Sequence, residues 1–419
     1  MKYSVVTFGC RVNQADSLGF EEDLLARGAV PVAPDQADLV LVNTCSVTAS
    51  ADQGARQTIR RIARDNPAAR IVVTGCYATR RPDEIAALPN VVRVIPNDNK
   101  PRLLPIIADD FDLTTGARYG QGDGACGAAI EPGLAGRTSF TLRVQTGCGE
   151  QCSYCIIPVT RGRPRSTPLA AILDEVQRIS AAGFKEIVLT GVHLGSYGRD
   201  VSPASSLVAL LRALEGGSAR GVQFRISSLE PMDCSREIVE LVAGSCFAPH
   251  FHLPLQHASD GMLAAMSRPY TIAYYDGLVD FIRGRIPHAS IGSDVIVGFP
   301  GETDNDFEQL LAYLERSPLT HVHVFPYSDR PGTAATSMSG KVPGAVVRER
   351  GRRVREVAAR LAERFRQSQI GTVRPGLTLD DGSSVVTDNY LKLRIPAGRP
   401  RNERVRVLIR SPHEGELVA

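Results

Sequence analysis

The sequence predicts an α/β protein with an N-terminal doubly wound parallel sheet, a central partial (β/α)6 barrel and a small C-terminal β domain. Two observations lead to the first two parts. Apolar, β-branched runs alternate with amphipathic stretches over the first hundred residues and again over 138–327, as in parallel sheets with helical crossovers. A third observation adds the last part, because short alternating strands follow from about residue 370. The expected boundaries are 1–108 and 138–367 for the two α/β domains, 109–137 for a linker and 368–419 for the β domain.

Composition narrows the class of protein. A chain of 419 residues, 43% of them hydrophobic, can build two or three cores without disulfide cross-links. Its formal net charge is only +3, so a nucleic-acid partner would have to be met by local basic patches. No stretch approaches the apolar length of a membrane span, and the N-terminus lacks a signal-peptide layout, so we expect a cytoplasmic protein without a membrane partner. Thiols stay reduced there, and nine cysteines therefore indicate metal binding or catalysis.

The N-terminal domain is expected to bring three cysteines together. Its expected strands are 4–8, 39–43, 71–74 and 91–95, with helices at 16–26 and 51–63. The first three strands are followed by Cys10, Cys45 and Cys76. Ligands bind at the carboxyl edge of open α/β sheets, so the three thiols should meet there as a metal site. Gly9 and Gly75 would let the backbone approach a bulky inorganic group. Ordinary packing of small hydrophobic residues is the alternative.

The linker is rich in Gly, Asp and Ala and shows little periodicity. Cys126 lies in it. Like Cys234 and Cys246, it has no close cysteine neighbour, and we expect these three thiols to be inert.

A second group of cysteines stands directly after the first strand of the central domain. Cys148, Cys152 and Cys155 occupy eight residues, in a CxxxCxxC pattern. This spacing lets three thiolates surround one soft metal centre and leaves a fourth coordination position free. A zinc knot lacking one ligand, or three unrelated buried thiols, would be the alternatives. The spacing resembles that of radical S-adenosylmethionine (SAM) enzymes, whose [4Fe-4S] cluster holds the amine and carboxylate of SAM on its open iron.

Six strand–helix units should form the partial barrel that is typical of radical SAM enzymes. The expected strands are 138–144, 186–190, 223–227, 250–254, 290–297 and 321–325. Barrels of this kind place their chemistry at the carboxyl ends of the strands. The resemblance therefore implies SAM contacts from residues at or near those ends, which are Tyr154, Gly191, Val192, Arg225, Ser227, Glu230, Gln256 and Asp294.

Some of these residues have structural alternatives. Arg225 could cap a helix or pair with a surface acid, Gln256 could satisfy backbone at the barrel edge, and Asp294 could orient a loop. His321 and His323 share one face of a strand, which a filled barrel interior explains as well as a metal site does.

Arginine is concentrated near the C-terminus. A helix is expected over 343–367, and its many arginines are either paired with the interspersed Glu349, Glu356 and Glu363 or available to phosphates. The strands expected after it are 377–379, 384–387, 391–395 and 404–409. This β unit occupies the place of the RNA-binding TRAM domain of the radical SAM methylthiotransferases, the family that the chain resembles.

The motifs together resemble the radical SAM methylthiotransferase family over essentially the whole chain. They are Gly9-Cys10-Arg11-Val12-Asn13, Asn43-Thr44-Cys45-Ser46-Val47-Thr48, Thr74-Gly75-Cys76-Tyr77-Ala78 and the CxxxCxxC run. The first motif and the helix at 56–61 are most similar to the branch that modifies N6-threonylcarbamoyladenosine at position 37 of tRNA. The resemblance implies two [4Fe-4S] clusters, SAM, the tRNA anticodon loop as substrate, and an electron donor such as flavodoxin or ferredoxin.

The resemblance also implies a division of labour between the two groups of cysteines. The cluster on Cys148, Cys152 and Cys155 would cleave SAM to a 5′-deoxyadenosyl radical, which would take the hydrogen from C2 of the adenine. The cluster on Cys10, Cys45 and Cys76 would carry the sulfur, methylated by a second SAM. Two alternatives remain at this point: methylthiolation of an aspartate in a ribosomal protein, and a non-catalytic, zinc-stabilised RNA-binding scaffold.

Overall fold

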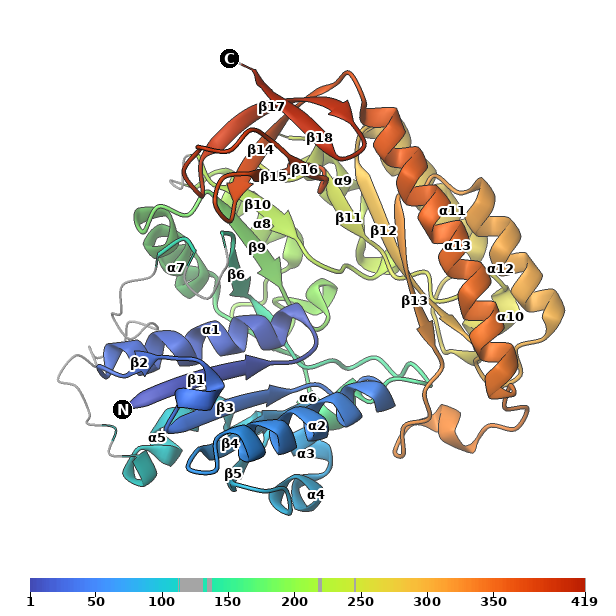
Figure 1. Cartoon of the computed structure of the whole chain (residues 1–419). Coiled ribbons are helices and arrows are strands. Elements are labelled where there is room, and N and C mark those ends of the chain that lie inside the picture. The colour runs from blue at the N-terminus through green and yellow to red at the C-terminus, as the bar shows by residue number, and fades with distance from the viewer. Residues whose placement is uncertain (112, 114–130, 134–137, 218–220, 245, 419) are drawn as a thin grey trace.

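The structure is a computed structural model, and it describes residues 1–111, 113, 131–133, 138–217, 221–244 and 246–418. Three regions follow one another along the chain, each with its own β-structure (Figure 1). Most of the expected linker, including Cys126, lies outside the described residues.

The N-terminal region contains the expected parallel sheet. Its strands are β1 (Lys2–Thr7), β2 (Val30–Pro31), β3 (Leu39–Thr44), β4 (Arg70–Gly75) and β5 (Val91–Ile95). Their order is β2-β1-β3-β4-β5, and every neighbouring pair is parallel. The helices are α1 (Arg11–Ala26), α2 (Ala49–Asp65), α3 (Cys76–Arg80), α4 (Pro82–Ala86) and α5 (Leu103–Ile107), with a 3₁₀ segment, η2 (Asn97–Arg102). The strand order reverses its direction between β1 and β3, which confirms a doubly wound sheet.

The alternation of side chains along β3 explains why helices cover both faces of the sheet. Val40 and Val42 pack on one face with Ile59 of α2. Leu41 packs on the other face with Leu24 of α1. Because successive side chains of a strand point to opposite faces, a strand of apolar residues alone needs a helix on each side.

The central region is a partial barrel of six parallel strands. They are β6 (Phe140–Arg143), β9 (Glu186–Thr190), β10 (Gln223–Ile226), β11 (His250–His252), β12 (Ser290–Val297) and β13 (His321–Pro326). They form two parallel sheets of three strands, and isolated parallel bridges such as Ser228 to His252 connect β10 to β11. A short antiparallel pair consists of β7 (Gln145–Thr146), which closely follows β6, and β8 (Arg165–Ser166). This arrangement confirms the predicted (β/α)6 architecture.

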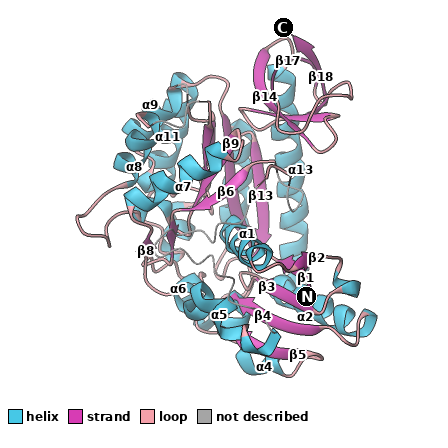
Figure 2. Cartoon of the chain, turned by 90° about the vertical axis from the view of Figure 1, so that its left-hand side faces the viewer, coloured by secondary structure: helices cyan, strands magenta, loops and turns pink. Residues whose placement is uncertain are grey.

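Helices cover the outside of these strands, as Figure 2 shows for α7, α8, α9 and α11. The helices are α6 (Ile157–Arg161), α7 (Leu169–Ala181), α8 (Leu207–Glu215), α9 (Arg236–Ala243), α10 (Asp260–Ala265), α11 (Ile272–Arg285), α12 (Asp304–Arg316) and α13 (Gly344–Gln369). Hydroxyl caps begin several of them; Thr303 and Asp306 form a reciprocal capping box at α12. The long helix α13 packs against β13 and α12.

The C-terminal region is a small closed barrel. Its strands are β14 (Val373–Leu379), β15 (Ser384–Thr387), β16 (Lys392–Arg394), β17 (Arg404–Ser411) and β18 (Glu414–Val418), in the order β14-β15-β16-β18-β17. The sequence did not reveal β18, because Glu414 and Glu416 make it look like a polar tail. Closure of the barrel pairs the edge that this strand would otherwise expose.

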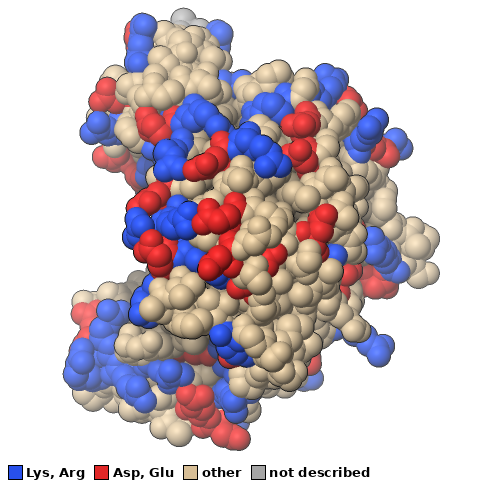
Figure 3. Space-filling view, turned by 90° about the vertical axis from the view of Figure 1, so that its right-hand side faces the viewer, with Lys and Arg blue, Asp and Glu red and all other residues tan. Residues whose placement is uncertain are grey.

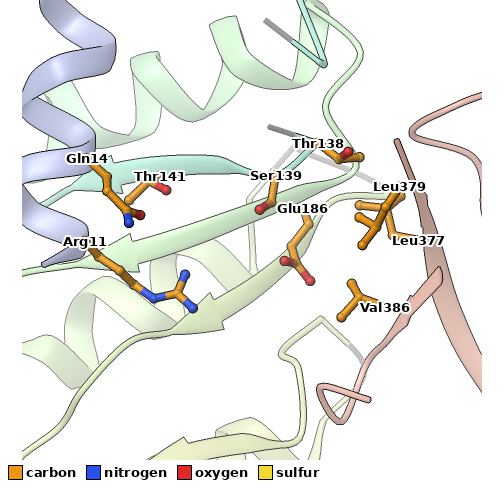
Figure 4. Close-up of a pocket in the computed structure, with 9 residues that line it drawn as sticks. All are labelled: Arg11, Gln14, Thr138, Ser139, Thr141, Glu186, Leu377, Leu379 and Val386. Atoms are coloured by element: carbon orange, nitrogen blue, oxygen red, sulfur yellow. The ribbon is translucent and has the colours of Figure 1, made fainter. Parts of the chain in front are cut away.

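The three regions meet at the amino-terminal end of the central strands. Tyr390, between β15 and β16, packs on His250 of β11 with 4.6 Å between ring centroids, and it accepts a 2.8 Å hydrogen bond from Arg11 of α1. A cavity of about 130 Å³ lies at the same junction. In Figure 4, Arg11 and Glu186 point into it, and Leu377 of the C-terminal barrel borders it. The C-terminal domain therefore closes the floor of the central barrel.

No described helix is long and apolar enough to cross a bilayer.

Candidate metal centres

The first three thiols stand where the strand order of the N-terminal sheet reverses. Cys10 precedes α1, Cys45 follows β3 and Cys76 begins α3, so adjacent strands deliver them to one edge. At Gly9, where φ is +87°, an added Cβ would lie 2.6 Å from the Cys45 sulfur. Only glycine fits there, because both the backbone conformation and the space exclude a side chain. We call Cys10, Cys45 and Cys76 the N-terminal trio.

The N-terminal trio is buried on one side and open on the other. Cys45 and Cys76 are buried, whereas Cys10 is exposed. Burial, together with the nearby Cys76 and Cys10, raises the pKa of the Cys45 thiol to about 12. Thiols in such a place ionise when a cation or cluster holds the thiolate, which makes metal loading and deprotonation one event.

Two polar side chains from distant segments reach the N-terminal trio. The buried guanidinium of Arg161, at the end of α6, interacts with Cys76 and Cys10 and donates a 2.5 Å hydrogen bond to Asn13. The amide of Asn97 lies 3.7 Å from the Cys76 sulfur and donates to Thr160 O at 2.7 Å. Donors of this kind stabilise anionic sulfur. Sequence reasoning missed both residues, because neither belongs to a cysteine motif.

Cys148, Cys152 and Cys155, the central trio, lie on a loop that backbone hydrogen bonds hold in place. The Cys155 N–H donates to Cys152 O at 3.0 Å, which folds the loop on itself. Ser153 at its centre donates to Met266 O and accepts from the Ala335 N–H. The sulfurs are therefore positioned by segments from several parts of the barrel.

Charged side chains surround the central trio. Arg268 donates to the Cys152 sulfur at 3.1 Å and forms an ion pair with Glu230. The Nδ1 atom of His193 lies 3.9 Å from the Cys148 sulfur, and its Nε2 atom lies 2.7 Å from Asp233. Burial alone would lower the pKa of His193, but Asp233 and Cys148 outweigh it and raise this pKa to about 10. No motif in the sequence points to His193 or Arg268.

Four of the residues expected to contact SAM lie beside the central trio. Burial raises the pKa of Tyr154 well above its usual value, and Arg268, Cys152 and Glu230 act on the same phenol. Arg268 donates hydrogen bonds both to the Glu230 carboxylate and to the Cys152 sulfur, and so connects these two residues. Gly191 and Val192 precede His193, and the Val192 N–H donates to the Gln145 side chain at 3.0 Å. A SAM contact from these four residues stays a prediction.

The other four residues lie further along the barrel. Ser227 donates to the Thr190 hydroxyl at 3.4 Å. The backbone of Gln256 pairs with the backbone of Asp294 and Ile296, and the role of its side chain stays a prediction. Asp294 accepts hydrogen bonds from two histidines of the lumen.

Arg225 points away from the central trio. Its guanidinium pairs with Glu186 at 2.7 Å, donates to Asp388 O and lies 5.0 Å from the centroid of the Tyr390 ring. Glu186 begins β9, so these partners stand at the floor of the barrel. Arg225 thus forms an ion pair, as one alternative predicted, but its partner is a buried acid rather than a surface acid. Nothing in the position of Arg225 supports a SAM contact.

The donor set of each trio consists of thiolates alone. A tetrahedral zinc ion with Zn–S bonds of about 2.3 Å holds its thiolates about 3.8 Å apart. Among the described residues, His252, Asp294 and His323 are the only His, Cys, Asp or Glu group of three with ligand atoms all within 4.8 Å of one another; neither cysteine trio meets this limit. Donor sets of thiolates alone suit an iron–sulfur cluster.

Helix α6 joins the two trios. It begins at Ile157, just after Cys155, and ends at Arg161, which reaches Cys76. It also packs against α3, which Cys76 begins. The two trios therefore belong to one interdomain region, although they are far apart in the sequence.

Several arginines of α13 form ion pairs with neighbouring acids. Arg353 pairs with Glu308 at 2.7 Å and Arg360 with Glu315 at 2.9 Å, both across to α12. Figure 3 shows Lys and Arg interspersed with Asp and Glu over the upper part of the molecule, and Lys and Arg gathered more closely on the lower lobe. Of the acids interspersed in α13, Glu349 and Glu356 pair with Arg352, as the pairing alternative predicted.

Comparisons with known proteins agree with this geometry. A model described as "Uncharacterized protein family UPF0004" matches residues 2–96, and the radical SAM superfamily model matches residues 142–314. The threonylcarbamoyladenosine tRNA methylthiotransferase MtaB of Aquifex aeolicus is 35% identical over 417 residues, covering 98% of this chain and all of that protein. The protein of the same name from Thermotoga maritima is 36% identical, covering 88% of this chain and 85% of its own.

The chain is also similar to a relative whose name contains a different nucleoside and to one solved structure. The tRNA-2-methylthio-N(6)-dimethylallyladenosine synthase of Streptomyces viridosporus is 31% identical, covering 95% of this chain and 80% of its own. The radical SAM methyltransferase TsrM of Kitasatospora setae, solved with cobalamin and a [4Fe-4S] cluster, superposes with a TM-score of 0.56 at 16% identity. It covers 80% of this chain and 77% of its own, which supports the fold alone.

Proposed function

The chain belongs to the radical SAM methylthiotransferase family, and from this premise we propose that it installs a 2-methylthio group on N6-threonylcarbamoyladenosine at position 37 of tRNA. The presence of two separate thiol trios, joined through α6, carries the proposal. A reaction that replaces an aromatic C–H by a C–S bond exceeds what acid–base side chains can do. The relatives named for threonylcarbamoyladenosine support the choice of nucleoside.

The two trios would each hold one [4Fe-4S] cluster. When bound, the clusters and SAM supply the electron transfer, the radical chemistry and the sulfur. Cys148, Cys152 and Cys155 would hold the SAM-binding cluster, and Cys10, Cys45 and Cys76 the sulfur-carrying one. Each trio leaves a fourth coordination position to a ligand from outside the protein.

The surrounding side chains hold charge and exclude water. Arg268 and Arg161 each bring a guanidinium to one trio, which offsets the negative charge of the thiolates. An apolar group packs around Tyr154 next to the central trio; it consists of Met262, Met266, Ile296, Phe299 and Ala335. A dry surrounding strengthens these electrostatic interactions and protects reactive species from side reactions.

The tRNA would present its anticodon loop with the target base unstacked, because bases are reached in single-stranded loops. An electron donor such as flavodoxin or ferredoxin would reduce the SAM-binding cluster. A tRNA substrate would place the enzyme in the cytoplasm.

Substitution of the cysteines tests the division of labour. We expect Cys→Ala at any of the six positions to abolish 2-methylthio-N6-threonylcarbamoyladenosine, measured by nucleoside mass analysis of tRNA after anaerobic reaction. Substitution of Cys10, Cys45 or Cys76 should leave reductive SAM cleavage in place. Substitution of Cys148, Cys152 or Cys155 should remove it.

Two results would contradict the proposal. Ribosomes that gain the methylthio mass increment while tRNA does not would make a ribosomal protein the substrate. Zinc without inorganic sulfide in anaerobically purified protein would exclude the chemistry altogether.

A further inference from the structure

The lumen of the central barrel carries a row of polar side chains, of which only Asp294 is among the residues expected to contact SAM. They come from the inward face of three neighbouring strands and are His250 and His252 of β11, Asp294 of β12, and His321 and His323 of β13. Strand register places His252 beside Gly292 and Asp294 beside His323. At Gly292 an added Cβ would lie 2.0 Å from His321 Nε2, so the glycine makes room for the imidazole.

Hydrogen bonds connect the upper part of this row. The Ser228 hydroxyl bonds His252 Nδ1 at 2.7 Å. The Nε2 atom of His252 and the Nδ1 atom of His323 both bond Asp294 Oδ1, at 3.1 and 3.2 Å. We call Ser228, His252, Asp294 and His323 the lumen tetrad.

The row has a closed end and an accessible end. At the floor, His250 is buried under Tyr390, and burial keeps its pKa well below the usual value, so the ring is neutral. At the other end the side chain of His323 is 61% exposed and that of Asp294 23% exposed. These polar atoms are therefore open to a molecule that enters the barrel.

The lumen tetrad lies on the way to the central trio. Ser228 follows β10 and shortly precedes Glu230, whose carboxylate pairs with Arg268, the donor to Cys152. A base that reaches the central trio through the lumen would therefore come close to these side chains.

We propose that the lumen tetrad binds the threonylcarbamoyl substituent on N6 of the target adenosine and selects it over an apolar substituent. The inference rests on the proposed function. A threonylcarbamoyl group offers amide N–H donors, a carbonyl, a hydroxyl and a carboxylate. The two imidazoles, the hydroxyl and the carboxylate of the lumen tetrad can pair with both hydrogen-bond donors and hydrogen-bond acceptors.

A dimethylallyl group, which appears in the name of a relative, offers no hydrogen-bond partner. Entry of such a group would desolvate the tetrad without compensation, and sites built from polar groups reject apolar analogues strongly for this reason. The lumen therefore supplies a physical basis for the choice between the two nucleosides.

The test compares substrates on the holoenzyme and its variants. The kcat and KM of wild type, His323→Leu, His252→Leu and Asp294→Asn are measured on tRNA carrying threonylcarbamoyladenosine or dimethylallyladenosine. Binding of free N6-threonylcarbamoyladenosine is measured by calorimetry. His413→Leu, on the exposed surface of the C-terminal barrel, is the matched control.

We expect His323→Leu to raise KM for the threonylcarbamoyl substrate at least about 10-fold, to weaken nucleoside binding similarly, and to narrow the kcat/KM ratio between the two substrates by about 100-fold or more. Iron and sulfide content and thermal unfolding show whether each variant is folded. His323 is largely exposed, so its variant stays informative if Asp294→Asn does not fold.

Two outcomes would overturn the inference. The substrate ratio and nucleoside affinity of His323→Leu could equal those of wild type. Alternatively, metal analysis could find a divalent ion, bound in addition to cluster iron, that all three variants lose. Wild-type enzyme that ignores threonylcarbamoyl tRNA would instead overturn the proposed function itself, which separates the two failures.

Discussion

At the scale of single residues, glycines decide how closely the backbone approaches the N-terminal trio. Gly75 has a φ of +99°, and an added Cβ would lie 2.2 Å from Thr44 O. That oxygen belongs to backbone directly before Cys45, so it cannot move without moving the thiol. Gly75 also stands directly before Cys76. A single methyl group would thus displace two of the three sulfurs.

We predict that Gly75→Ala prevents assembly of one of the two clusters. Iron and sulfide per chain, measured after anaerobic reconstitution, should fall by about half, because the central trio is untouched. Reductive SAM cleavage should remain, whereas the methylthio product should disappear.

Gly54→Ala provides the control, because Gly54 lies in α2 and an added Cβ would meet nothing within 4 Å. This variant should keep full iron content and gain about 0.5–1 kcal/mol in stability. Full iron content in Gly75→Ala would show that the turn tolerates a side chain.

At the scale of elements, α2 and α13 use their arginines differently. The α13 arginines at 353 and 360 bond acids of α12, so they fix one helix against another. The exposed Arg60 and Arg61 of α2 have no ion pair with a described acidic residue. Helix α2 begins shortly after Cys45, so its arginines lie on an element that leads away from the N-terminal trio. They are better placed than Arg353 and Arg360 to meet a phosphate backbone.

We predict that the double variant Arg60→Gln and Arg61→Gln weakens tRNA binding. The slope of log K against log salt concentration should become shallower by roughly 0.7–0.9 for each phosphate that an arginine no longer neutralises. Filter binding or fluorescence anisotropy over a salt series measures this slope.

The double variant Arg353→Gln and Arg360→Gln is the matched control. Its tRNA affinity should change little, and its stability should fall by only about 1 kcal/mol or less, because exposed ion pairs contribute little. The reverse pattern of affinities would place the RNA on α13 instead.

At the scale of the whole molecule, Asp16 of α1 joins the N-terminal domain to the barrel. Its carboxylate lies 2.8 Å from the ammonium of Lys100 and 3.6 Å from Arg161, and it also pairs with Arg143 of β6. Burial alone would raise the pKa of Asp16, but the three cations outweigh it and lower this pKa to about 2. An uncompensated charge here would be costly, since breaking a buried pair typically costs about 3–5 kcal/mol.

We predict that Asp16→Asn lowers the unfolding temperature markedly and changes its dependence on pH. The pKa of Asp16 is depressed in the folded state. The carboxylate therefore stabilises the protein at pH values above the pKa of an aspartate in the unfolded chain, which is about 3.9. That contribution disappears as pH falls toward 2. Thermal unfolding of cluster-free protein between pH 5 and 2 should therefore show a smaller acid-induced loss of stability in the variant than in wild type.

Asp35→Asn is the control for this prediction, because Asp35 is exposed and lies in a 3₁₀ turn outside this ion-pair group. The unfolding temperature of Asp35→Asn should depend on pH as that of the wild type does. Identical pH curves for Asp16→Asn and wild type would show that the junction contributes nothing to acid stability.

The sequence by itself determined the fold class, both cysteine trios and the family. Periodicity and motif spacing are local properties, so strands such as Glu186–Thr190 and Ser290–Val297 could be predicted to the residue. The chemistry of the trios followed in the same way, because the order of a parallel sheet brings strand ends to one edge.

Only the tertiary structure decided which side chains surround the trios and the lumen. Arg268 lies 116 residues from Cys152 along the chain, and no local pattern links them. The sequence allows Arg225 either to contact SAM or to pair with an acid. In the folded chain Glu186 lies 2.7 Å from its guanidinium and forms the ion pair. Such interactions depend on how distant segments pack, and neither composition nor spacing contains that information.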